Sequence, residues 1–263
     1  MVPVQVVQGD GPLILAFPHV GTQVPPEVAA RLNAEGRLLR DTDWHIQDLY
    51  AGLIPGLTTV TATRSRYVID LNRDPSGSSL YPGQPTTGLI PQSTFDNVLI
   101  WHQPPGAADV AHWLDAVHRP YHAALAAEVA RVRARHGVAV LYDCHSIRSR
   151  CPWLFPGVLA DLNIGTNTGT TCAPQMVQAV AGLCAASGHS WVLDGRFKGG
   201  WTTRHYGRPE TGVHAIQMEL SQISHLAAEE PPFALHPMRA AHLRKTLTEI
   251  LATLADLAPR LAH

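Results

Sequence analysis

Short runs rich in apolar and β-branched residues alternate along this chain with longer segments of helical spacing, and this alternation limits the fold more than any other feature. Strands are expected at residues 12–17, 57–63, 67–71, 138–142 and 213–220. Helices are expected at residues 25–33, 42–54, 107–136, 174–187 and 237–257. Pro120 should break or kink the third helix because proline lacks a backbone N–H. Strands interleaved with helices predict an α/β fold with a largely buried sheet.

Length and charge favour one domain that acts on a small molecule. The 263 residues are enough for one sizeable core, and no repeat or linker divides them, so one domain spanning residues 1–263 is expected. Twenty Lys and Arg against 21 Asp and Glu give a net charge of -1. That balance leaves no overall basic field for nucleic acid or an anionic membrane. We therefore expect a small-molecule substrate, with no nucleic-acid or membrane partner, while the oligomeric state is unknown.

Cysteine spacing and the N-terminal segment favour a cytoplasmic protein. Cys144, Cys151, Cys172 and Cys184 match neither a paired CxxC zinc site nor a dense disulfide framework. The first 17 residues have no basic segment before their apolar stretch, and no run approaches the ~18 apolar residues of a membrane span. Reduced thiols and an unprocessed, cytoplasmic chain are expected.

Polar side chains lie at or near the ends of several predicted strands. His19 follows the first strand, Asn72 and Arg73 follow the third, and His145 and Glu219 lie near the ends of the last two. In α/β sheets, ligands bind in the crevice outside the carboxyl ends of the strands. These residues are spread over some 200 positions of sequence, yet they could converge on one site.

His19 and His145 are candidate metal ligands. A catalytic zinc site takes three protein ligands from His and carboxylate and keeps one open position, so the third ligand would be Asp43 or Asp41. We prefer Asp43 as the ligand and Asp41 as a helix cap. Asp143 is two residues from His145 on the same side of an extended segment and could orient it. The alternatives are an ordinary loop histidine and a polar strand end.

Charged residues near the other strand ends are candidates for catalysis and substrate binding. Asn72 and Arg73 could present a fixed donor fork to a carboxylate or carbonyl oxygen, although arginines on loops usually face solvent. Glu219 shares a strand face with apolar residues, so it could be a general base with a raised pKa or a salt-bridged carboxylate. Ser146 lacks the GxSxG elbow, and Cys144 and its sequence neighbour His145 point to opposite faces of a strand.

Nine stretches of the chain together resemble one known family. In order they are FPHVGTQVPPEV, RDTDWHIQDLY, SRYVIDLNRDP, TTGLIPQSTFD, RPYHAAL, YDCHSIRS, LNIGTNTG, GRFKGGWTTRHYG and GVHAIQMEL. They run from about residue 13 to 224 and resemble the N-formylglutamate amidohydrolases, the deformylases that end one route of histidine degradation. The resemblance implies a mixed β-sheet flanked by helices, like that of the zinc carboxypeptidases and aspartoacylases (phosphorylase/hydrolase-like), with one Zn²⁺ per chain.

The resemblance also implies an activity and roles for particular residues. The family hydrolyses N-formyl-L-glutamate to formate and L-glutamate. By position, His19, Asp43 and His145 would bind the metal, and Glu219 would be the catalytic glutamate. Asn72 and Arg73 match the Asn-Arg pair that handles substrate in the wider superfamily. That superfamily has a His-x-x-Glu ligand pair, whereas this chain has Thr22 three residues after His19, so the carboxylate ligand departs from the pattern.

The expected mechanism is metal-assisted amide hydrolysis with Glu219 as the proton carrier. Arg66 or Arg73 would stabilise the negative charge of the tetrahedral intermediate. The substrate has two carboxylates, for which Arg73, Arg148 and Arg204 with Thr203 are candidate anchors. The glycines of FKGGW should leave room around the small formyl group. The alternatives are a zinc amidase for another N-acyl amino acid and a non-catalytic dicarboxylate-binding protein.

Overall fold

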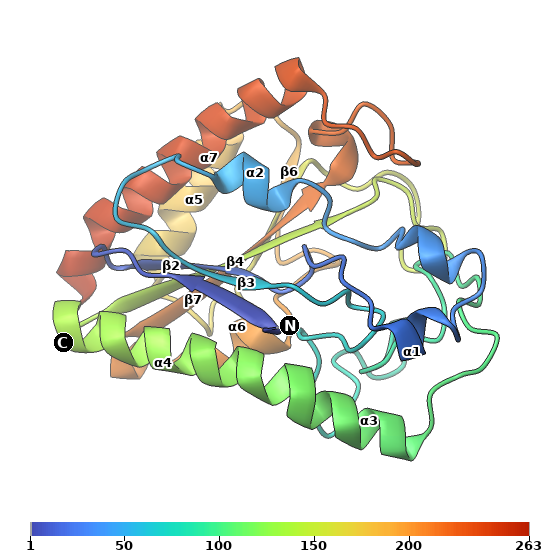
Figure 1. The fold of residues 1–263 in the computed structure, drawn as a ribbon. Helices are drawn as coiled ribbons and strands as arrows, with labels where there is room; N and C mark the ends of the chain where they lie inside the picture. Colours follow the sequence, from blue (N-terminus) through green and yellow to red (C-terminus); the bar gives the residue numbers. More distant parts are fainter. Residues whose placement is uncertain (1, 263) are drawn as a thin grey trace.

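A seven-stranded mixed β-sheet forms the centre of the protein in a computed structural model that describes residues 2–262 (Figure 1). The strands are β1 (Val4–Val7), β2 (Leu13–Phe17), β3 (Thr58–Ala62), β4 (Ala139–Ile147), β5 (Leu162–Gly165), β6 (Trp191–Leu193) and β7 (Val213–Ser221). Their order across the sheet is β1-β3-β2-β4-β7-β5-β6. Strands β3, β2, β4 and β7 are parallel to their neighbours in that series, whereas β1 and β5 join it antiparallel.

Helices cover both faces of this sheet. They are α1 (Pro26–Ala29), α2 (Ile46–Tyr50), α3 (Ala107–Trp113), α4 (Arg119–His136), α5 (Pro174–Ala186), α6 (Trp201–Tyr206) and α7 (Pro237–Leu257). Short 3-10 turns lie at Gly36–Leu38, Pro209–Thr211, Gln222–Ser224 and Ala258–Leu261. Helices α2, α5 and α7 pack in one apolar cluster, and α3 and α4 pack in another on the opposite face (Figure 1). The predicted α/β fold with a mixed, largely buried sheet is confirmed.

Two predicted elements near the site differ from the structure. Residues 67–71 form turns instead of a strand, although the four apolar side chains of this segment are buried. The backbone there bonds to another loop, with the Asp70 N–H donating to the Leu89 carbonyl at 2.8 Å. The helix expected at residues 42–54 is reduced to α2 (Ile46–Tyr50). The buried apolar side chains of residues 67–71 therefore do not imply that the backbone of this segment forms hydrogen bonds to a neighbouring strand.

The helical segment at residues 107–136 continues through Pro120. A π-helical turn at Leu114–His118 joins α3 to α4, and Pro120 lies in the first turn of α4. A wider turn just before a proline accommodates the missing N–H without ending the helix. Of the predicted break or kink at Pro120, the break is wrong, and the helix is instead irregular just before the proline. The continuous segment carries His118 and His122 against the loop that follows residue 70.

One face of the two central strands changes from apolar to polar halfway along. Because side chains alternate in a strand, Asp143 and His145 follow Ala139 and Leu141 on the same face of β4, where those two apolar residues belong to the core beneath α3 and α4. Strand β7 is in parallel register, with His145 opposite Glu219. The polar halves lie at the carboxyl ends of the strands, which is where α/β sheets bind ligands.

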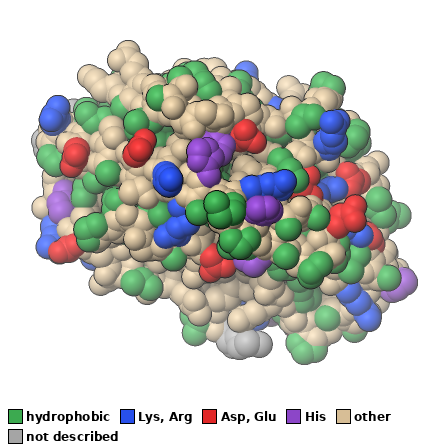
Figure 2. Space-filling model, turned by 90° about the horizontal axis from the view of Figure 1, so that it is seen from above, with side chains coloured by type: hydrophobic (Ala, Val, Ile, Leu, Met, Phe, Trp, Pro, Cys, Tyr) green, Lys and Arg blue, Asp and Glu red, His purple; other side chains and the backbone are tan. Residues whose placement is uncertain are grey.

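The described surface carries charges of both signs. On the face shown in Figure 2, acidic and basic side chains are interspersed, with no basic field across it. Within residues 2–262, no helix combines the length and the apolar character that crossing a bilayer requires.

Candidate active site

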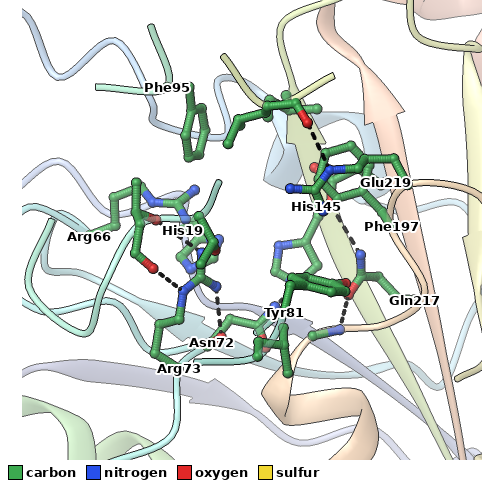
Figure 3. A pocket seen from close by; sticks show the side chains of 17 residues that line it. His19, Arg66, Asn72, Arg73, Tyr81, Phe95, His145, Phe197, Gln217 and Glu219 are labelled. Carbon is green, nitrogen blue, oxygen red and sulfur yellow. Dashed lines mark hydrogen bonds between the residues drawn. The ribbon is translucent and has the colours of Figure 1, made fainter. Parts of the chain in front are cut away.

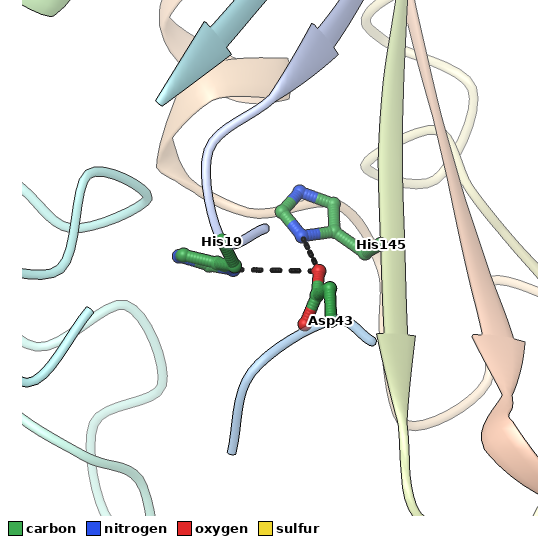
Figure 4. A group of neighbouring side chains, drawn as sticks. All are labelled: His19, Asp43 and His145. Carbon is green, nitrogen blue, oxygen red and sulfur yellow. Dashed lines mark ion pairs between the residues drawn. The ribbon is translucent and has the colours of Figure 1, made fainter. Parts of the chain in front are cut away.

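His19, Asp43 and His145 meet at the carboxyl ends of β2 and β4. His19 Nδ1 is 3.8 Å and His145 Nδ1 is 3.4 Å from the same oxygen of Asp43, Oδ2 (Figure 4). The two imidazole rings have centroids 5.0 Å apart. Among the described residues, these three are the group of His, Cys and acidic side chains able to hold a metal ion, with ligand atoms within 4.8 Å of one another.

The other nitrogen of each imidazole faces a buried carboxylate. His19 Nε2 is 2.7 Å from Asp70 Oδ1, and His145 Nε2 is 3.1 Å from Asp143 Oδ1. The first contact is an aligned hydrogen bond, while the second is an ion pair by distance without that alignment. Metal-binding histidines commonly donate their second N–H to a carboxylate, which fixes the ring and leaves the other nitrogen for the ion. His19 Nδ1 is presented in this way, whereas His145 Nδ1 faces Asp43 with Asp143 held to the ring by charge and distance alone.

The donor set fits a small divalent cation. Both carboxylate oxygens of Asp43 are buried without a hydrogen-bond partner; the nearest guanidinium nitrogen, Arg66 Nη1, lies 3.9 Å from Oδ1. Two ligands of a tetrahedral zinc ion, each ~2.0 to 2.1 Å from the metal, lie roughly 3.4 Å apart. Separations of 3.4 and 3.8 Å from Asp43 Oδ2 are close to that value. A bound ion would satisfy this buried carboxylate between the two imidazoles.

Asp41 has a different partner set from Asp43. Its Oδ2 accepts hydrogen bonds from the Tyr67 hydroxyl at 2.9 Å and from the Phe95 N–H at 3.0 Å. Asp41 thus joins two loops, and the predicted helix-cap role is wrong because the residue preceding α2 is His45, with no side-chain cap. Of the two predicted carboxylates, Asp43 is the one placed beside the histidines.

Glu219 projects from β7 beside this cluster and is 7% exposed. Its Oε2 accepts a hydrogen bond from Gln217 Nε2 at 3.1 Å. Burial raises the pKa of Glu219 well above its usual range, although the nearby His145 opposes that shift. A carboxylate with a raised pKa binds a proton more readily than an exposed one and can therefore exchange a proton with a bound substrate.

Asn72 is held in place on three sides. Its backbone N–H donates to Asp70 Oδ1 at 2.9 Å, and its Oδ1 accepts from the Thr202 N–H at 2.8 Å. Its Nδ2 therefore faces His145 Nε2, at 3.2 Å. A Cβ placed on Gly200 would come within 2.1 Å of Asn72 Nδ2. The second glycine of FKGGW thus makes room for Asn72 and also lines the cavity, so the predicted room around a formyl group stays a prediction.

A cavity opens beside the cluster and contains several of the predicted residues. His19, Arg66, Asn72, Arg73, His145 and Glu219 line it (Figure 3). Arg66 donates to Asp70 Oδ2 at 2.6 Å, and Arg73 donates to the Thr87 carbonyl and hydroxyl at 2.9 and 3.0 Å. Nearby carboxylates raise the pKa of Arg66 despite its burial, so it stays charged.

Three predicted substrate-binding residues do not line this cavity. Arg148 pairs with Asp96 at 2.6 Å, and Thr203 donates to Asp143 Oδ2 at 3.1 Å. Arg204 donates to the Gly199 carbonyl at 2.9 Å and lies over the Tyr81 ring. Arg196, Gln217 and Tyr81 also line the cavity, although they are not among the predicted site residues. Gln217 could have been found from its place on the Glu219 face of β7, whereas no sequence signal marks Arg196 or Tyr81.

Comparison with known proteins gives a consistent result along most of the chain. The family model described as N-formylglutamate amidohydrolase matches residues 11–225. An N-formylglutamate deformylase of Pseudomonas aeruginosa is 45% identical over 251 residues, which is 94% of each chain. A second N-formylglutamate deformylase, from Pseudomonas putida, is 43% identical over 228 residues, or 85% of each chain.

Solved structures agree in fold. The crystal structure of an N-formylglutamate amidohydrolase from Ralstonia eutropha superposes with a TM-score of 0.83 at 28% identity and covers 99% of both chains. A gene product of Agrobacterium tumefaciens superposes with a TM-score of 0.72 at 16% identity, over 97% of this chain and 96% of that one. The second likeness concerns the fold alone.

Proposed function

This chain belongs to the N-formylglutamate amidohydrolase family, and we propose that it hydrolyses N-formyl-L-glutamate to formate and L-glutamate with one bound zinc ion. Its relatives identify it as an amidohydrolase that acts on a small molecule. The observation that carries the zinc proposal is the buried Asp43 carboxylate, which lies between two oriented imidazoles and lacks a hydrogen-bond partner.

His19, Asp43 and His145 would hold the ion and leave one coordination position open. When bound, the ion would polarise the formyl carbonyl and lower the pKa of water towards ~7. Asp70 and Asp143 keep the two imidazoles oriented for this task. The departure at Thr22 is consistent with this set, because Asp43 supplies the carboxylate from a different segment of the chain.

Glu219 acts in this proposal as the proton carrier. Its carboxylate takes a proton from the attacking water and delivers it to the leaving amine nitrogen as the C–N bond breaks. Its buried position raises its pKa, which suits a group that must hold the proton between the two steps. The hydrogen bond from Gln217 Nε2 fixes one carboxylate oxygen and leaves the other for substrate.

Arg66 stabilises the oxyanion of the tetrahedral intermediate, and Asn72 with Arg73 orients the substrate. Asp70 fixes the Nη2 of Arg66, while its Nε is buried without a hydrogen-bond partner. Arg66 is therefore a rigid cation at the cavity with one N–H available for the oxyanion. Asn72 contacts His145, so its neighbour Arg73 lies near the metal-ligand cluster. In this proposal Arg73 therefore binds the substrate carboxylate on the carbon next to the amide nitrogen. Thr203 acts through Asp143.

We place this reaction in the cytoplasm, at the end of histidine degradation. The four cysteines are buried free thiols, which suits a reducing compartment. A strain lacking the gene should excrete or accumulate N-formylglutamate when histidine is its nitrogen source. If that strain grows on histidine without accumulating N-formylglutamate, the enzyme does not take part in histidine degradation.

The proposal is tested by measuring formate release and bound metal together. Purified protein should contain about one zinc per chain, release formate from N-formyl-L-glutamate, lose this activity after dialysis against a chelator, and regain it with Zn²⁺. N-acetyl-L-glutamate and N-formyl-L-aspartate serve as competing substrates. Preference for one of them would favour a different N-acyl amino acid as substrate. Binding of formylglutamate without turnover would indicate a dicarboxylate-binding protein, and full activity of metal-free protein would contradict the zinc proposal.

A further inference from the structure

Arg196 lines the cavity from the loop between β6 and α6, and its charge has no carboxylate partner. Its Nε donates to the Leu154 carbonyl at 2.9 Å and its Nη2 donates to the Pro85 carbonyl at 2.8 Å. Its Nη1 is buried and makes no hydrogen bond. None of the ion pairs found within residues 2–262 includes Arg196. We propose that Arg196 binds the side-chain carboxylate of the substrate, an inference that rests on the proposed deformylase function.

The other two arginines of the cavity are already engaged. Arg66 is paired with Asp70 at 2.6 Å, and Arg73 Nη2 lies 3.8 Å from the same Asp70 carboxylate. Asp70 therefore offsets much of their positive charge. Arg196 is held by neutral carbonyl groups, which fix the direction of the guanidinium without cancelling its charge. A rigid, uncompensated guanidinium with a free N–H is complementary to a carboxylate.

Arg196 is half-buried, and its Nη1 is shielded from solvent. Burial and the positive charge of Arg73 lower the pKa of Arg196, while Tyr81 and Glu219 act in the opposite direction. A partly desolvated charge without an ion-pair partner is stabilised by an incoming anion. A substrate with two negative charges would therefore gain from both Arg73 and Arg196, whereas a substrate with one negative charge would leave a cation unpaired.

The surroundings of Arg196 suit a short aliphatic linker that ends in a carboxylate. Its guanidinium lies over the rings of Tyr81 and Phe197, with 5.0 and 5.5 Å to the centroids. Leu154 and Ile147 line the same cavity and belong to a small apolar cluster against which Phe197 packs. The two methylene groups of a glutamate side chain would lie against this wall. Arg73, next to Asn72, remains for the carboxylate beside the scissile amide.

The test compares N-formyl-L-glutamate with N-formyl-L-glutamine, which has the same shape but a neutral side-chain end. In Arg196→Gln, kcat/KM for formylglutamate should fall at least ~100-fold, mainly through KM, while the value for formylglutamine should change by less than about 3-fold. Arg196→Lys should keep a preference for formylglutamate because it keeps the charge. Arg135→Gln, on the exposed side of α4, is the matched control and should behave as wild type.

The outcomes separate this inference from the proposed function. Wild-type protein that releases formate from neither substrate would contradict the deformylase proposal. If wild type is active but Arg196→Gln loses kcat/KM equally for both substrates, the role of Arg196 is overturned. An equal loss is what a loosened loop would produce. If Arg196→Lys fails to prefer formylglutamate although wild type does so, the charge is not what is recognised. If Arg196→Gln loses the preference for formylglutamate while Arg196→Lys and Arg135→Gln keep it, the contact between Arg196 and the side-chain carboxylate is established.

Discussion

The two ends of the cavity are built in different ways. One part, here called the strand end, holds His145 on β4, Glu219 on β7 and His19 just after β2, where the strand ladder sets the backbone positions, while Asp43 joins it from the loop before α2. The other part, here called the loop end, is built from loops that side chains tie together, as when Arg73 donates to Thr87 and Arg196 donates to Pro85. Ladder hydrogen bonds resist displacement as a unit, whereas a loop contact depends on one or two side chains.

This difference divides the work of the enzyme. In the proposed mechanism the strand end holds the groups that act on any formyl amide, namely the ligand cluster and Glu219. The loop end carries Arg73 and Arg196, which in the proposals above bind the carboxylates of the substrate. Changes at the strand end should therefore lower turnover equally for all substrates, and changes at the loop end should alter the ranking of substrates.

The largest effect is expected for Glu219→Gln. The substitution keeps the size of the side chain and removes the proton carrier, so kcat should fall by about 10³-fold for formylglutamate and formylglutamine alike. Bound zinc and the thermal unfolding midpoint should stay near wild type, which metal analysis and calorimetry would check. Glu249→Gln, exposed on α7, is the control. A loss confined to one of the two substrates would show that Glu219 recognises substrate instead of moving protons.

A smaller effect is expected for Asp70→Asn, which affects both ends. Asp70 accepts hydrogen bonds from His19, from Arg66 and from the backbone of Asn72. Although burial opposes it, Arg66 and Arg73 keep the pKa of Asp70 well below its usual range, so it is a carboxylate. Neutralising it should weaken zinc binding by roughly 10- to 100-fold. Competition with a zinc-binding dye would measure this, with the exposed Asp256→Asn as control. Unchanged zinc affinity would show that His19 needs no such partner.

The same division explains what the sequence could predict. His19, His145 and Glu219 lie close together because parallel strands end at one edge of a sheet, a rule that needs only the strand pattern. Loops follow no such period, so Arg148 and Arg204 were equal candidates with Arg73, yet Arg148 pairs with Asp96 and Arg204 with the Gly199 carbonyl. The path of residues 194–200 brings Arg196 to the cavity, and no local pattern encodes that path.

Buried irregular segments set the other limit. The apolar run at residues 67–71 predicted a strand, but the backbone turns so that Asp70 and Asn72 face the histidines. Hydrophobic patterning reports which side chains are buried and does not report the backbone partners. Strands β1, β5 and β6 were not predicted, because they have four, four and three residues, too few for a clear pattern.

The smallest effect is expected at Gly200, where the loop end touches the strand end. The backbone of Gly200 has φ of -78°, which alanine adopts freely, so Gly200→Ala acts through its added methyl group alone. That methyl group would overlap Asn72, whose side chain is held between Thr202 and His145. Displacing Asn72 should lower kcat/KM about 10-fold, because misplaced orienting groups slow a reaction without removing its chemistry.

Gly182→Ala is the matched control for this change, because a Cβ on Gly182, in α5, meets no atom within 4 Å. Steady-state kinetics with formylglutamate and formylglutamine would show whether the loss in Gly200→Ala is shared. A shared loss assigns Asn72 to the strand end, since it then supports the reaction itself. A loss restricted to formylglutamate would place Asn72 with Arg73 and Arg196 in substrate recognition. Wild-type kinetics would mean that the cavity absorbs the methyl group, and the contact between Gly200 and Asn72 would then contribute nothing to either end.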